Sequence, residues 1–186
     1  MGKTMAAGLL VLLAAGSAFA SEDIAVWKGR KAADALTRNL QGRMLEAMAE
    51  SGPMGAISIC AYQAQATKIH LERKEGVTAK RTSLRLRNME NAPDDYEMGM
   101  LNRFKTTTMT AGFQEERIEL LVKGGAKIYR YTRPIFIDMS CLPCHGAREQ
   151  MQEDIRAYLD ERYPGDQATG YMEGDIRGIV SVTIPE

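Results

Sequence analysis

Five consecutive residues of the chain, Cys141-Leu142-Pro143-Cys144-His145, have the types and spacing of the C-x-x-C-H motif. This motif is typical of covalent attachment of a c-type haem. Each cysteine thiol adds across one vinyl group of the haem, and the adjacent histidine then lies under the iron as its proximal ligand. The sequence therefore predicts one haem c, bound covalently by Cys141 and Cys144 and ligated by His145.

Other interpretations of these residues stay open. A bare C-x-x-C pair is also typical of thioredoxin-like redox proteins, in which a helix N-terminus activates the first thiol. Half of a zinc site would need a second pair of ligands. The remaining cysteine and histidine are Cys60 and His70, and a period of 3.6 residues places them about 80° apart around one helix. This arrangement disfavours zinc, and a chance occurrence of the motif is the last alternative.

The N-terminal residues have the three parts of a secretory signal. Lys3 supplies the positive charge, residues 6–15 form an apolar run, and Ala18-Phe19-Ala20 is a small-residue cleavage site. The apolar run is too short for a stable membrane helix. We therefore expect a signal peptide over residues 1–20 and a mature chain of 166 residues (186 minus 20) beginning at Ser21.

Export and covalent haem attachment agree, because bacteria attach haem c outside the cytoplasm. The two features together predict a protein of the periplasm. Without Lys3 the chain carries 23 basic and 24 acidic residues, so no basic excess favours nucleic acid. The mature length suits a domain of ordinary size, which we divide into an N-terminal helix over residues 21–52 and a haem domain over residues 53–186.

Apolar residues at three- and four-residue spacing predict a long helix over residues 22–50. Ser51-Gly52-Pro53 breaks it, and Pro53 suits the first turn of a second helix that ends at Gly76. Cys60 lies on the apolar stripe of that second helix, and His70 lies on its charged face. A long N-terminal helix can pair with its copy in a second subunit, so a homodimer stays open.

The rest of the chain alternates strands and helices. We expect strands over residues 77–86, 117–122, 126–131 and 176–184, with Gly124-Gly125 as the turn of a hairpin. We expect helices over residues 93–105 and 147–163, a polar connection over 106–112 and an extended piece over 134–137. This order predicts an α+β fold, an antiparallel sheet with helices packed on it.

A haem held by His145 has a second axial position. Cys60 is the odd thiol of an exported chain, and binding iron would protect it from oxidation. The alternative is a buried free cysteine that acts as a small apolar residue. His70 among charged residues is more typical of a solvated side chain. The methionines that stay candidates are Met44, Met48, Met98, Met100 and Met172.

Several further motifs stand in the chain: Ile57-Ser58-Ile59-Cys60, Lys80-Arg81-Thr82-Ser83-Leu84-Arg85-Leu86-Arg87-Asn88, Asn91-Ala92-Pro93-Asp94, Cys141-Leu142-Pro143-Cys144-His145-Gly146 and several stretches within 163–178. Together they resemble one family, the monohaem c-type cytochromes with a PAS-like haem domain, long catalogued as a domain of unknown function. The resemblance implies a PAS-like antiparallel sheet flanked by helices, and axial ligation by a cysteine and a histidine. Cys60 and His145 stand at the matching positions.

Redox or gas sensing is the role that the resemblance implies. Carbon monoxide or nitric oxide would be the ligand, and the signal would pass to a separate protein because the chain has no recognisable output segment. A low-potential electron carrier is the alternative. An enzyme ranks last, since no distal histidine is evident. Arg81, Arg85 and Arg87 are candidates for binding the haem propionates, because arginine suits planar carboxylates, with a solvated strand edge as the alternative.

Overall fold

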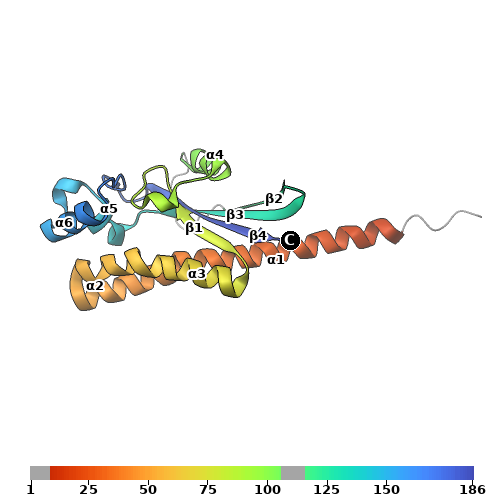
Figure 1. The fold of residues 1–186 in the computed structure, drawn as a ribbon, viewed down its shortest axis with the longest axis horizontal. Coiled ribbons are helices and arrows are strands. Elements are labelled where there is room, and N and C mark those ends of the chain that lie inside the picture. Colours follow the sequence, from red (N-terminus) through yellow and green to blue (C-terminus); the bar gives the residue numbers. More distant parts are fainter. Residues whose placement is uncertain (1–8, 106–115) are drawn as a thin grey trace, which may run out of the picture.

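The computed structural model describes residues 9–105 and 116–186, and it has an α+β fold with a long N-terminal helix (Figure 1). The four strands form one antiparallel sheet in the order β1-β4-β3-β2. These observations confirm the predicted class. The strands are β1 (Thr78–Thr82), β2 (Arg117–Lys123), β3 (Ala126–Phe136) and β4 (Ile176–Pro185). The helices are α1 (Leu9–Leu36), α2 (Arg38–Ser58), a π-helical segment (Ile59–Gln63), α3 (Ala64–Glu75), α4 (Asp95–Phe104), α5 (Leu142–His145) and α6 (Glu153–Arg162).

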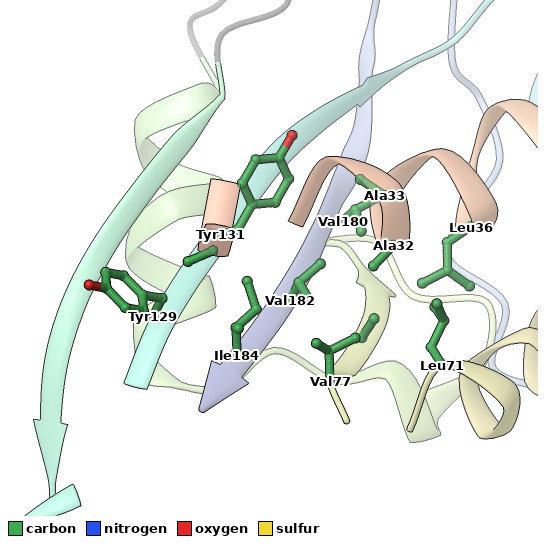
Figure 2. Close-up of a cluster of buried hydrophobic side chains, with 12 residues drawn as sticks. Ala32, Ala33, Leu36, Leu71, Val77, Tyr129, Tyr131, Val180, Val182 and Ile184 are labelled. Carbon is green, nitrogen blue, oxygen red and sulfur yellow. The ribbon is translucent and has the colours of Figure 1, made fainter. Parts of the chain in front are cut away.

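Helices cover both faces of the sheet. Neighbouring residues of a strand point to opposite faces, so they pack against different helices. Val180 and Val182 of β4 belong to the main apolar cluster under α1 and α3, which Figure 2 shows with Tyr131 and Leu36. Ile179, one residue away in the same strand, instead packs against Met100, Leu101 and Phe104 of α4. Both faces of the sheet therefore contribute buried side chains to the core.

The first helices form a hairpin that returns along its own path (Figure 1). Gly52 has a φ of 67° inside α2, which confirms the predicted break in the helix, and the chain reverses there. The returning arm ends at Gly76, whose left-handed conformation (φ 65°) closes α3, also as predicted. Although α1 has 28 residues, no helix in the described ranges is long and apolar enough to cross a membrane.

The N-terminal helix predicted over residues 22–50 is present, but it differs from the prediction in two respects. The helical backbone already begins at Leu9, and it is interrupted at Thr37. Arg133 of β3 donates hydrogen bonds to Asp34 Oδ1 (2.8 Å) and Thr37 Oγ1 (3.0 Å) at this interruption. The break therefore coincides with hydrogen bonds from a distant strand. The apolar period of the helix does not predict these bonds.

Two further predicted elements, one strand and one helix, were longer than the structure shows. The strand expected over 77–86 ends at Thr82, where the backbone of Gly178 lies so close that an added Cβ would be 2.2 Å from Thr82 O. The helix expected over 147–163 begins only at Glu153. The carbonyl of Gly146 accepts a hydrogen bond from Gly170 N (2.6 Å), which holds this part of the chain in a loop.

The turn signal between the two predicted hairpin strands was read correctly. Gly124 and Gly125 both have positive φ, which the two-residue turn between β2 and β3 requires. Asp94 and Glu97 cap the start of α4 reciprocally, two residues from the predicted start. The predicted connection over residues 106–112 lies outside the described residues.

Candidate functional site

A cavity of about 230 Å³ lies where the helical hairpin meets the end of the sheet. The hairpin contributes one wall, which includes Cys60. The segment after β3 contributes the C-x-x-C-H motif, and the ends of β1 and β4 contribute basic side chains. The structure therefore brings together residues that the sequence separates by more than eighty positions. The chemically capable lining residues are Met44, Met48, Cys60, Arg81, Arg87, Cys141, Cys144, His145, Tyr163 and Arg177.

Asp138 positions the first cysteine of the motif. Its carboxylate accepts a hydrogen bond from Ser140 N (2.8 Å) and caps the short 3-10 helix Met139–Cys141. Gln41 of α2 donates a hydrogen bond to the same carboxylate, and the Cys141 thiol lies 3.5 Å from it. Asp138 therefore makes hydrogen bonds within the loop that carries Cys141, and it also bonds this loop to α2 on the other side of the cavity.

The ring of His145 is oriented by a backbone carbonyl. Its Nδ1 lies 2.7 Å from the oxygen of Ala168. A carbonyl only accepts, so Nδ1 carries the proton and the lone pair of the neutral ring is on Nε2. Burial, together with the charges of Arg87 and Arg177, holds the pKa of His145 well below its usual value. A neutral imidazole with one oriented nitrogen is the form that ligates a metal.

The two motif thiols are not activated for redox exchange. Cys60, Cys141 and Cys144 are all free. Burial is the main cause that raises the pKa of Cys141 to about 11, and burial also raises the pKa of Cys144. Thioredoxin-like pairs need the opposite shift, because the thiolate is the attacking form. The electrostatics therefore disfavour the thioredoxin-like interpretation.

Cys60 lies in the π-helical segment Ile59–Gln63 and lines the cavity, where it is half-buried. Single π-turns are rare and recur at functional sites. His70, ten residues later, is exposed and is not among the lining residues. Of the candidate methionines, Met44 and Met48 of α2 also line the cavity. Met100 of α4 is buried against the sheet, and two others are exposed on the surface: Met98 and Met172.

The three predicted arginines have different surroundings. Arg81 lines the cavity, and within residues 9–105 and 116–186 its guanidinium has neither a hydrogen bond nor an ion pair. Arg87 also lines the cavity but donates to Asp166 (3.0 Å) and to the carbonyl of Cys144 (2.6 Å). Arg85 lies outside the lining, with its guanidinium 4.1 Å from the ring centre of Tyr171.

Arg177 is a lining residue that the sequence analysis did not single out. Its Nη1 donates to the carbonyl of Arg85 (3.1 Å), and it has no carboxylate partner among the described residues. Burial is the main cause that lowers its pKa to about 10, and burial also lowers the pKa of Arg81. Two partly buried guanidinium groups that line one cavity without a carboxylate partner favour an anionic ligand there.

The fold and the site together define an α+β protein with a cavity that offers cysteine, histidine and arginine side chains. A family model matches residues 14–185, so the chain belongs to the Tll0287-like family. It is also similar to the solved structure of the cyanobacterial heme-protein Tll0287. The two are 29% identical with a TM-score of 0.57, over 69% of this chain and 72% of that chain. No curated protein matches the sequence.

Proposed function

We propose that this chain binds one haem c and acts as a redox or gas sensor in the periplasm. Cys141 and Cys144 would hold the haem covalently, His145 would be the proximal iron ligand, and Cys60 the distal one. The observation that carries the proposal is that these four side chains, from two distant parts of the sequence, line one cavity. Membership of a family that includes a haem protein supports it.

The residues around the cavity fit this group. Haem carries two carboxylates, and Arg81 and Arg177 are the two lining guanidinium groups without a carboxylate partner in the described part of the chain. His145 presents Nε2 because Ala168 occupies Nδ1. The apolar lining residues Leu36, Leu40, Ile57, Ile135 and Phe136 suit the flat hydrophobic ring. Bound haem would supply a redox-active iron with two axial positions.

Sensing follows from the chemistry of the distal residue. A thiolate donates strongly and stabilises ferric iron, so ligation by Cys60 predicts a reduction potential well below that of a His/Met cytochrome. Departure of Cys60 from the reduced site would be the local event that a partner protein detects. If Cys60 stays bound in both states, the chain is instead a low-potential electron carrier.

The finer assignments belong to the same proposal. The antiparallel sheet with helices on both faces is compatible with a PAS-like domain, and fold analogy alone is a weak argument for function. We also propose cleavage of the signal peptide after Ala20 and a binding protein rather than an enzyme.

An optical titration of the exported protein tests the ligands. We would compare wild type with Cys60→Ala in the ferric and ferrous states, with and without carbon monoxide. His70→Ala is the matched control, because His70 is exposed on the same helical arm. We expect a sulfur-to-iron charge-transfer band in ferric wild type and in His70→Ala, and its loss in Cys60→Ala. We also expect ferrous wild type to bind carbon monoxide.

Three results would count against the proposal. If haem can be extracted from the denatured wild type, Cys141 and Cys144 do not bind it covalently. Identical ferric spectra of wild type and Cys60→Ala would show that Cys60 is not an iron ligand. A ferrous protein that stays six-coordinate and inert to carbon monoxide, with Cys60 still bound, would favour the electron carrier.

A further inference from the structure

The two arms of the helical hairpin have a register that places Cys60 opposite particular residues of α2. Arg43 Nη1 donates to Gln63 Oε1 (2.5 Å), and Lys31 Nζ pairs with Glu75 Oε1 at 2.8 Å. In this antiparallel arrangement Met44 is offset from the level of Cys60 by two residues, which is about 3 Å along the helix axis. A flexible methionine side chain spans this offset.

Met44 is also close to the loop that carries the C-x-x-C-H motif. It lies three residues after Gln41, so the two share one side of α2. Gln41 donates a hydrogen bond to Asp138, and Asp138 caps the helix that ends at Cys141. Met48 lines the same cavity but stands one turn farther from this contact. Met44 therefore lines the same cavity as Cys60, on the side of α2 that Gln41 attaches to the motif loop.

We propose that Met44 replaces Cys60 as the distal iron ligand when the site is reduced. The inference rests on the proposed function and specifies how that site is regulated. Bound haem would accept one electron from an external one-electron reductant, and the Cys60 thiolate would then leave with its bonding pair and take one proton from water. The thioether sulfur of Met44 would then donate its lone pair in place of Cys60.

The exchange is favourable because the two ligands prefer different oxidation states. A charged thiolate stabilises ferric iron, whereas neutral methionine ligation raises the reduction potential, which means that it stabilises ferrous iron. Met has three rotatable bonds and a polarisable sulfur, so it can reach a vacated position without a shift of α2. A sensor built this way responds to reduction itself, and Met44 limits the access of gas ligands.

The test uses the haem-loaded full chain reduced with dithionite under anaerobic conditions. A methionine bound to low-spin ferrous iron gives a strongly upfield-shifted methyl resonance in the proton NMR spectrum. We expect this resonance in wild type and its loss in Met44→Leu. Carbon monoxide should bind Met44→Leu at least about tenfold faster, because it binds only iron from which the methionine has dissociated. Met48→Leu and Met54→Leu are the matched controls, and both should keep the resonance.

Leucine for methionine conserves volume, so the variants should fold, and an unchanged ferric spectrum verifies this. The inference is overturned if reduced wild type lacks the resonance, or if Met44→Leu keeps it. Loss in Met48→Leu with retention in Met44→Leu overturns the assignment to Met44. A ferric wild type without covalent haem or without the Cys60 band overturns the proposed function first. If the ferric protein has covalent haem and the Cys60 band, a contradictory result for the ferrous methyl resonance overturns only the exchange of Cys60 for Met44. The proposed function then stands.

Discussion

Nδ1 of His145 donates to the carbonyl oxygen of Ala168 over 2.7 Å, so the motif histidine is oriented by a loop more than twenty residues away. Arg87 reinforces this relationship, because its guanidinium donates to the carbonyls of Cys144 (2.6 Å) and Ala168 (3.3 Å). The same guanidinium pairs with Asp166 at 3.0 Å. The segment after β1 therefore attaches the motif to the loop that positions its histidine.

Replacing Arg87 should destabilise the protein severely. In Arg87→Ala the Asp166 side chain, which is only 4% exposed, is left without its cationic partner. Removing one member of a buried ion pair costs about 3–5 kcal/mol, so we expect a loss of this size in the free energy of unfolding by urea.

The control for this prediction is Arg38→Ala. Arg38 forms an ion pair with Asp34 in which the side chains are 64% and 38% exposed. Pairs of this kind contribute about 0–1 kcal/mol. Equal losses in the two variants would show that the pair of Arg87 and Asp166 has no special role.

Arg81→Gln and Arg177→Gln should change stability in opposite directions with and without haem. In haem-free protein each substitution removes a guanidinium that lacks a carboxylate partner, so the melting temperature should stay constant or rise. In haem-loaded protein each should lower the melting temperature, because a charge-assisted bond to a propionate is lost. Thermal unfolding of both forms checks the sign, and equal changes in both forms would exclude a role in binding the propionates.

Sequence reasoning succeeded where the structure is decided locally. Gly52, Gly76 and the Gly124-Gly125 pair were identified because positive φ favours glycine, and each stands at the expected break or turn. The helix expected from Pro93 was likewise found, and it begins two residues later at Asp95. Cys60 could be placed on an inward helical face from the apolar period alone.

The misses came from contacts that only the folded chain makes. The break at Thr37 coincides with hydrogen bonds from Arg133, nearly one hundred residues away. The early end of β1 coincides with the close approach of Gly178. Arg177 could not be ranked above other arginines, because its distinguishing property is that it lines the cavity without a hydrogen-bonded or ion-paired carboxylate in the described part of the fold. Neither the period of a helix nor the alternation of a strand encodes such relationships.

Two glycines in the first helices should respond oppositely to alanine. A Cβ at Gly29 would lie 2.4 Å from the ring of Tyr131, so Gly29→Ala should be destabilising by about 1–3 kcal/mol through overpacking. A Cβ at Gly42 has nothing within 4 Å, so Gly42→Ala should stabilise by about 0.5–1 kcal/mol through helix propensity. Urea unfolding of both variants measures the difference, and a stabilising Gly29→Ala would contradict the close packing of α1 on β3.

Glu116 should give α1 a pH-dependent attachment to the sheet. Its carboxylate accepts hydrogen bonds from Arg30 Nε (2.8 Å) and from the Tyr131 hydroxyl (2.7 Å). The bond from Arg30 is the main cause that holds the pKa of Glu116 below its usual value, although burial opposes the shift. A lowered pKa stabilises the fold above the ordinary value of about 4.3, and this contribution is lost as the pH falls through the folded-state value.

Thermal unfolding of Glu116→Gln against wild type checks this dependence. The variant should be less stable at pH 7, and the two melting temperatures should converge as the pH falls below about 4. The exposed Glu149→Gln controls for the loss of one negative charge. A difference for Glu116→Gln that is constant from pH 7 to pH 3 would contradict the role of the ionised carboxylate.

The π-turn at Ile59–Gln63 should decide where Cys60 points. A π-turn holds one residue more than the α-helical path, so deleting the exposed Tyr62 should restore α-helix and rotate Cys60 by about 100° relative to Ala64. The far-ultraviolet circular dichroism should stay constant, while the ferric charge-transfer band expected for Cys60 is lost. Tyr62→Ala keeps the residue count and should keep the band. If deletion and substitution both keep it, the π-turn is not what directs Cys60 into the cavity.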